Sequence, residues 1–276
     1  MRCHRFRSPV ILLVLGLVTA PTAAIAQADC RTWGGCAEVR EGWTSFEQHA
    51  LSLGVTAAVG GLTAGIRRGL EGESFWKGFR TGALGGAVGY VGKRVSGERF
   101  TGAGIAGREL SAIGASIVLN ASEGRDAFDR LILPIGFVRL EMDRDRARLL
   151  DLSVDLAAAG ATAYLLAGGA RLDWGKSLEA GSPVLVEEDY TATGGRHVAG
   201  AIELRRDYSD LMRETLSHEQ VHVAQSDFAS IIWSVPLERS ILPKFGVPAG
   251  VANRLNLGIH HLFRLAVVAS IEYEND

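Results

Sequence analysis

The sequence has almost no net charge. It holds 29 Lys and Arg residues against 31 Asp and Glu residues, which gives a formal net charge of −2. A nucleic-acid-binding chain is expected to carry an excess of basic residues, and this one does not. We therefore expect no nucleic-acid partner. The length of 276 residues is sufficient for one large domain or two small ones.

Cysteine is also scarce, with three residues in the whole chain. Cys3 lies in an N-terminal segment that runs from basic residues through an apolar stretch to small residues ending at Ala26, MRCHRFRSPVILLVLGLVTAPTAAIA. This layout is typical of a secretory signal peptide, so we expect residues 1–26 to be cleaved after Ala26 and the protein to be exported to the periplasm, the cell envelope or the medium. A membrane anchor is the alternative, but the apolar stretch is short for a bilayer span.

The other two cysteines, Cys30 and Cys36, follow the predicted cleavage site closely. In an oxidising compartment they can close a small disulfide loop, and the alternative is a pair of free thiols. The residues Trp33-Gly34-Gly35 between them indicate a turn, and no histidine flanks either cysteine. Neither cysteine is therefore expected to be catalytic.

Glycine is unevenly distributed. Over residues 51–124, glycines and alanines recur three or four positions apart. On a helix this spacing leaves a smooth stripe against which another helix can pack closely, so residues 27–130 are expected to form the Cys pair and a glycine-rich helical region. Residues 50–66 carry no charge and allow membrane contact, whereas their Gly and Ala content favours tight packing in a soluble core.

The pattern changes to strand-like segments after residue 130. Alternating or β-branched segments predict strands at residues 131–133, 136–141, 183–187 and 197–204. Between them, an alanine-rich segment ending at Gly168-Gly169 predicts a helix over residues 154–167. The fold class is therefore expected to be α+β, with residues 131–276 forming the second region.

A short motif of the form H-E-x-x-H follows the last predicted strand, within the segment LSHEQVHVAQ (residues 216–225). Asp207 or Ser209 can cap a helix that runs through this motif, and residues four apart share one face of a helix. The rings of His218 and His222 can therefore converge on one metal ion, and Glu219 follows the first histidine directly. The alternative is a surface helix with two histidines and no metal.

A strand, a short connection and a helix with H-E-x-x-H resemble the core of the zincin metallopeptidases, in which an edge strand aligns the substrate peptide beside the metal. The resemblance covers the chain from about residue 184 onward and depends on one short motif. It implies one Zn²⁺ per chain held by His218 and His222, with Glu219 as the general base that takes a proton from the zinc-activated water. It also implies a peptide or protein substrate.

The third zinc ligand is less well defined. Metzincins continue the motif with a glycine and a third histidine, but Gln225 and Phe228 occupy those positions here. In gluzincins, a glutamate on a later helix binds zinc and an aspartate four residues on contacts a zinc-binding histidine. This resemblance implies Glu272 as the third ligand and Asp276 as the residue that orients a histidine. The alternative third ligands are Glu274 and Glu238.

Three further histidines of this region lie outside the motif. His260 and His261 are adjacent, so on a helix they point about 100° apart and do not both serve one site easily. The pair is expected to be partly solvated, and the alternative is that one of them contacts a substrate or an oxyanion. His197 is expected at the entrance of a strand and not on a metal.

The sequence therefore predicts an exported zinc metallopeptidase. Two other classes stay open: a non-catalytic envelope or membrane-associated protein, and a zinc-binding scaffold without turnover. Metal content and cleavage of peptides distinguish the three classes. The oligomeric state is not predicted.

Overall fold

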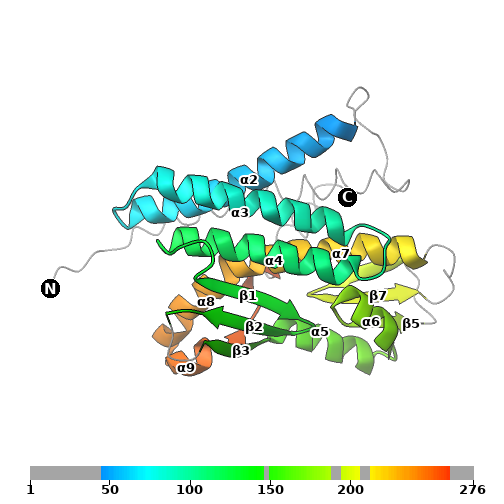
Figure 1. Ribbon diagram of the computed structural model, residues 1–276. Coiled ribbons are helices and arrows are strands. Elements are labelled where there is room, and N and C mark those ends of the chain that lie inside the picture. Colours follow the sequence, from blue (N-terminus) through cyan, green and yellow to red (C-terminus); the bar gives the residue numbers. More distant parts are fainter. Residues whose placement is uncertain (1–44, 146–148, 188–193, 206–211, 262–276) are drawn as a thin grey trace, which may run out of the picture. The chain divides into compact units, whose positions relative to one another are not determined.

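The computed structural model describes residues 45–145, 149–187, 194–205 and 212–261 (Figure 1). Contacts group the chain into Met1–Val55 and Thr56–Asp276, a division that falls inside the first described helix. Several predicted features lie outside the described residues: the signal peptide, Cys30, Cys36, Asp207, Ser209, Glu272, Glu274 and Asp276.

Three helices account for the glycine-rich region: α2 (Ser45–Leu70), α3 (Phe75–Ser96) and α4 (Ala103–Ser122). A Cβ atom added to Gly114 of α4 would lie 2.6 Å from the carbonyl oxygen of Gly85 on α3, and one added to Gly85 would lie 2.7 Å from the oxygen of Gly114. The two backbones are thus in direct contact. The predicted close packing of glycine-bearing helices is present.

Among the described residues, Phe46–Leu70 is a helical stretch that is long and apolar enough to cross a membrane, a property shared by core helices of soluble proteins. Within the second unit, this helix packs its small residues on α3. Ala64 is fully buried, and a Cβ atom added to Gly60 would lie 3.0 Å from the backbone nitrogen of Gly86. Membrane contact by residues 50–66 stays a prediction.

The first sheet contains β1 (Arg130–Ile135), β2 (Val138–Asp143), β3 (Leu150–Asp155) and β8 (Leu255–Asn256), in that order. The first three strands form an antiparallel meander, and β8 pairs in parallel with the end of β3.

Two predicted elements here are present but begin two residues later than expected. The strand expected from residue 136 begins at Val138, because Gly136 has a φ of +62° and forms a turn with Phe137. The helix expected from residue 154 begins at Leu156, because β3 continues to Asp155, whose side chain caps the helix by accepting from the Ala158 N–H (3.0 Å).

The second sheet has the order β4-β5-β7-β6. Its strands are β4 (Arg171–Leu172), β5 (Val184–Glu187), β6 (Gly195–Val198) and β7 (Ala201–Arg205). The helix α5 (Leu156–Ala167) precedes β4, and the helix α6 (Trp174–Ala180) connects β4 to β5. The single strand expected over residues 197–204 is instead a hairpin. Ala199 (φ +46°) and Gly200 (φ +89°) form a two-residue turn of the kind that reverses a chain. The turn makes β6 an edge strand, antiparallel to β7.

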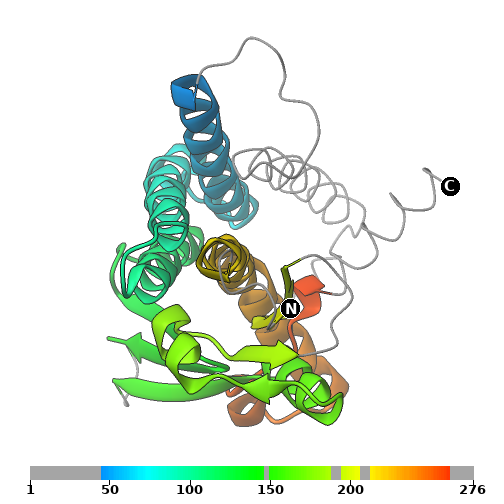
Figure 2. The same ribbon diagram turned by 90° about the vertical axis from the view of Figure 1, so that its right-hand side faces the viewer.

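The motif lies on α7 (Met212–Ala229), as predicted. This helix continues into a π-helical segment, η2 (Ser230–Ser234), and then α8 (Val235–Ile241), η3 (Leu242–Phe245) and α9 (Ala249–Ala252). The motif helix α7 packs on α3 and α4 and also on β6 and β7 (Figure 2).

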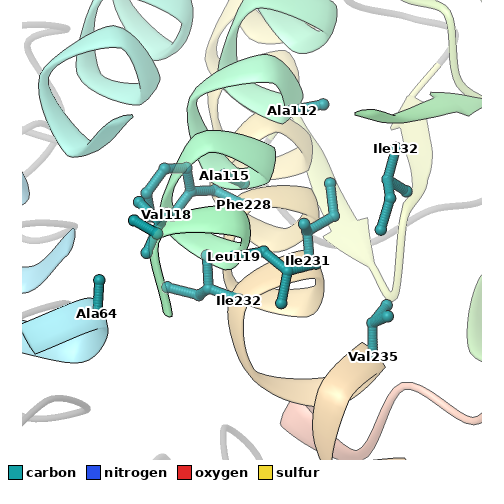
Figure 3. Close-up of a cluster of buried hydrophobic side chains, with 11 residues drawn as sticks. Ala64, Ala112, Ala115, Val118, Leu119, Ile132, Phe228, Ile231, Ile232 and Val235 are labelled. Carbon is teal, nitrogen blue, oxygen red and sulfur yellow. The ribbon is translucent and has the colours of Figure 1, made fainter. Parts of the chain in front are cut away.

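The core between α4 and the end of α7 is apolar. Val118 and Leu119 of α4 meet Phe228, Ile231 and Ile232 (Figure 3). The Phe228 ring rests on Gly89 of α3, where an added Cβ atom would collide with the ring. The fold is thus α+β, as expected.

Candidate metal centre

The motif helix is fixed to its neighbours by buried polar contacts. Arg108 of α4 forms an ion pair with Asp227 of α7 (Nε to Oδ2, 2.5 Å) and also donates to the carbonyl groups of Gly136 (3.0 Å) and Gly181. The hydroxyl of Ser111 donates to the carbonyl oxygen of Ala224 (3.2 Å). Because these contacts flank one end of the motif, they define how α7 presents its histidines.

His218 and His222 lie on the same face of α7, one turn apart. Their Nε2 atoms are 3.2 Å apart, and their rings are nearly perpendicular, with centroids 4.8 Å apart. Two zinc–nitrogen bonds of about 2.0–2.1 Å at a tetrahedral angle separate the nitrogens by about 3.3 Å. The pair therefore has the spacing of two ligands of one zinc ion.

Gln225 sets the tautomer of His222. Nδ1 of His222 lies 3.2 Å from Oε1 of Gln225. Because an amide oxygen can only accept, Nδ1 carries the hydrogen and Nε2 presents its lone pair toward His218. A partner on the second ring nitrogen is the usual way in which a protein orients a zinc-binding histidine. Gln225 was not expected in this role.

Glu219 is buried, with 5% of its surface exposed, whereas His218 and His222 are half-buried. The general-base role that the resemblance implies for Glu219 stays a prediction.

Five of the seven histidines gather in this part of the fold. The centroid of His197 on β6 lies 6.5 Å from that of His222 and 6.4 Å from that of His261, and the rings of His260 and His261 are 3.9 Å apart. His197 comes near the motif because β6 and β7 form a hairpin. The Ala199-Gly200 turn was the sequence signal for this arrangement.

Two of the histidines outside the motif, His197 and His260, have hydrogen-bond partners at their ring nitrogens. Nε2 of His197 accepts from the backbone N–H of Gly200 (2.8 Å), so in the neutral ring Nδ1 carries the hydrogen and acts as a donor. His260 contacts the hydroxyl of Ser234 through Nδ1 (2.8 Å) and the hydroxyl of Ser226 through Nε2 (3.2 Å). These rings line the site as hydrogen-bonding groups.

Within the described ranges, no group of three or more His, Cys, Asp or Glu side chains is arranged to hold a metal ion. The carboxylate of Glu238 accepts from the backbone N–H groups of Leu257 (2.6 Å) and Ile259 (2.9 Å), so it anchors the segment that carries His260 and His261. Burial raises the pKa of Glu238, and the two backbone N–H groups oppose that shift. The roles given to Glu272, Glu274 and Asp276 lie outside the described residues and stay predictions.

A cavity of about 710 Å³ lies at the β4 edge of the second sheet, between residues of β4, α6 and β5 and Met212. The histidines are near β6, at the other edge of this sheet, and none of them lines the cavity. The cavity is therefore separate from the histidine pair.

Comparisons with known proteins identify no relative of this chain. No family model matches it, and no curated protein or solved structure shows significant similarity to it.

Proposed function

We propose that the chain is an exported zinc-dependent peptidase, the function implied by its resemblance to the zincin metallopeptidases. The observation that carries the proposal is the 3.2 Å separation of the Nε2 atoms of His218 and His222. It matches the spacing of two zinc ligands, and the contact to Gln225 leaves the lone pair of His222 directed to the same place.

The residues have distinct roles in this proposal. His218 and His222 would hold zinc, and Gln225 would orient His222. Zinc, when bound, lowers the pKa of a coordinated water toward neutrality and polarises a carbonyl group. Glu219 accepts the proton of the attacking water and delivers it to the departing amine, as a general base and then a general acid.

The arrangement of strands supports a peptide as the substrate. In the described part of the second sheet, β6 is the last strand in the order and pairs with β7, and α7 packs against both strands. An extended peptide that paired with the outer side of β6 would lie beside His197 and the motif helix. Export rests on the predicted signal peptide, with cleavage after Ala26.

The experiment is a peptide-library digest with the full chain and two variants of α7. Glu219→Gln should retain zinc and lower the cleavage rate by at least about 100-fold, because it removes the proton acceptor and leaves both histidines in place. Glu214→Gln, on the same helix but paired with Arg99 at the surface (2.8 Å), is the matched control and should keep the rate of the parent.

Three outcomes would contradict the proposal. Full activity of Glu219→Gln with zinc bound would remove Glu219 from the mechanism. A parent chain that binds zinc and cleaves no peptide would favour a zinc-binding scaffold without turnover; chelation would then lower Tm without affecting any reaction. A parent chain that binds no zinc would favour the second candidate, a non-catalytic envelope or membrane-associated protein, for which the apolar stretch of α2 is the supporting observation.

A further inference from the structure

A serine and a histidine meet one helical turn beyond the metal pair. Ser226 follows His222 by four residues on α7, and its hydroxyl oxygen lies 3.2 Å from Nε2 of His260. A serine inside a helix can instead bond a carbonyl group of its own helix, as Ser116 does with Ala112 (2.9 Å). The contact of Ser226 is a tertiary one, to a ring 34 residues further along the chain.

The ring of His260 is oriented from its other side by Ser234. Nδ1 of His260 lies 2.8 Å from the Ser234 hydroxyl, which also accepts the backbone N–H of His260 (2.9 Å). A neutral imidazole carries its hydrogen on one nitrogen. With the hydrogen on Nδ1, Ser234 accepts it, and the lone pair of Nε2 faces the Ser226 hydroxyl. A hydroxyl, an imidazole that can take its proton and a third group that orients the imidazole are the parts of an activated serine nucleophile.

The π-helical segment η2 supplies the third group. It ends at Ser234, whose side chain is fully buried. Single π-helical turns inside α-helices are frequent at functional sites. The backbone before His260 is held as well, because Glu238 accepts the N–H of Ile259 (2.9 Å). Both the backbone and the ring of His260 are thus fixed relative to Ser226.

We propose that Ser226 and His260 form a nucleophile–base pair that transfers acyl groups from activated carboxylic esters. Both residues are half-buried, so part of each stays accessible. Oγ of Ser226 forms a bond to the ester carbonyl carbon while its proton passes to Nε2 of His260. The bond to the alcohol oxygen then breaks, and His260 returns the proton to the leaving alcohol. Water attacks the acyl-serine by the same transfers, which releases the carboxylic acid and restores the hydroxyl.

The third group sets the class of substrate. A carboxylate in the place of Ser234 would stabilise the imidazolium that forms, and a hydroxyl carries no charge. The imidazolium of His260 is therefore stabilised less, and the pair suits esters with a good leaving group rather than amides. No step involves a metal ion, so this reaction goes beyond the proposed peptidase and does not rest on it.

Labelling with a tagged fluorophosphonate tests the proposal. The serine oxygen bonds to phosphorus, fluoride leaves, and the proton goes to the base. The full chain would be incubated with the probe in excess EDTA, and the adduct would be located by mass spectrometry of its peptides. We expect the adduct on Ser226. His260→Gln should label at least tenfold more slowly, because transfer to a positioned base contributes a factor of about 100 to 10,000.

Ser240→Ala is the matched control. It removes an exposed serine of α8 whose hydroxyl donates to the carbonyl oxygen of Leu237 (2.8 Å), and it should label at the rate of the parent. Circular dichroism melts establish which variants are folded. Where His260→Gln unfolds, Ser234→Ala takes its place, because it keeps the ring, removes the partner of Nδ1 and should also slow the labelling.

Three results would overturn the proposal: a folded parent without an adduct on Ser226, an adduct that forms equally fast in the folded His260→Gln or Ser234→Ala variant, or an adduct that forms only when zinc is present. Zinc content and peptide cleavage are measured separately. Failure of the peptidase proposal would therefore leave the labelling of Ser226 unchanged.

Discussion

Arg108 on α4 and Asp227 on α7, 119 residues apart in the chain, form an ion pair that is almost fully buried. Arg108 also holds the carbonyl groups of Gly136 and Gly181, so one side chain ties the motif helix to the first sheet and to the end of α6. The position of His218 and His222 therefore depends on a contact made by the glycine-rich region.

Breaking this pair should destabilise the protein strongly. Asp227→Asn leaves the Arg108 guanidinium buried without its counter-charge, and such changes cost about 3–5 kcal/mol. Urea unfolding should show this loss. Glu71→Gln is the control, because Glu71 pairs with Arg67 at the surface (3.6 Å) and the change should cost less than about 1 kcal/mol. Equal losses in the two variants would contradict the structural role given to Asp227.

Glycine packing between helices gives a second prediction. A Cβ atom at Gly92 of α3 would lie 2.7 Å from the carbonyl oxygen of Gly107 on α4, whereas one at Gly160 of α5 meets nothing within 4 Å. Gly92→Ala should lower the free energy of unfolding by about 2 kcal/mol through overpacking. Gly160→Ala should raise it by up to about 1 kcal/mol, because alanine favours a helix. Thermal melts of both variants check the opposite signs, and stabilisation by Gly92→Ala would contradict the close packing.

Glu109 gives a pH-dependent prediction. Burial raises the pKa of its carboxyl group from 4.5 to about 7. The positive charge of Arg108 opposes this shift, and the negative charge of Asp227 adds to it. The Oε2 atom of Glu109 has no hydrogen-bond partner among the described residues. Between these pH values the folded state holds a proton that the unfolded state has released. Stability from Glu109 is thus complete below about pH 4.5 and is lost as the pH rises through 7.

Glu109→Gln removes this ionisation. The variant should have a higher Tm than the parent at pH 8 and nearly the same Tm at pH 5. Glu98→Gln, at an exposed position, is the control and should change Tm little at either pH. A gain in Tm that is equal at pH 5 and pH 8 would contradict the role of burial at Glu109.

Local sequence patterns predicted the elements that depend on local periodicity. The glycine spacing predicted closely packed helices, and the motif predicted a helix with two histidines on one face, because both follow from the 3.6-residue repeat. The strand β3 was not predicted, since its outward leucines and inward Ser153 and Asp155 reverse the usual alternation. Its inward Asp155 pairs with Arg139 of β2, and Arg139 also donates to the hydroxyl of Ser230, which is 91 residues further along the chain.

The site was predicted only as far as the motif itself. Gln225 was considered as a departure from a family pattern, and its contact with His222 depends on a side-chain rotamer that no spacing rule fixes. The alternation over residues 197–204 predicts one strand with His197 at its entrance, whereas the structure has a hairpin there. The turn at Ala199-Gly200 brings it to the edge strand near His222, a consequence of tertiary structure.

Metal content tests the central claim most directly. The full chain, the double variant His218→Ala/His222→Ala and the control His49→Ala, which changes a histidine of α2, would be equilibrated with zinc, desalted and analysed for elements. The account predicts about one zinc per chain in the parent and in His49→Ala, and none in the double variant, because a structural or catalytic zinc site needs its histidine ligands. A parent that binds no zinc, or a folded double variant that binds as much as the parent, would contradict it.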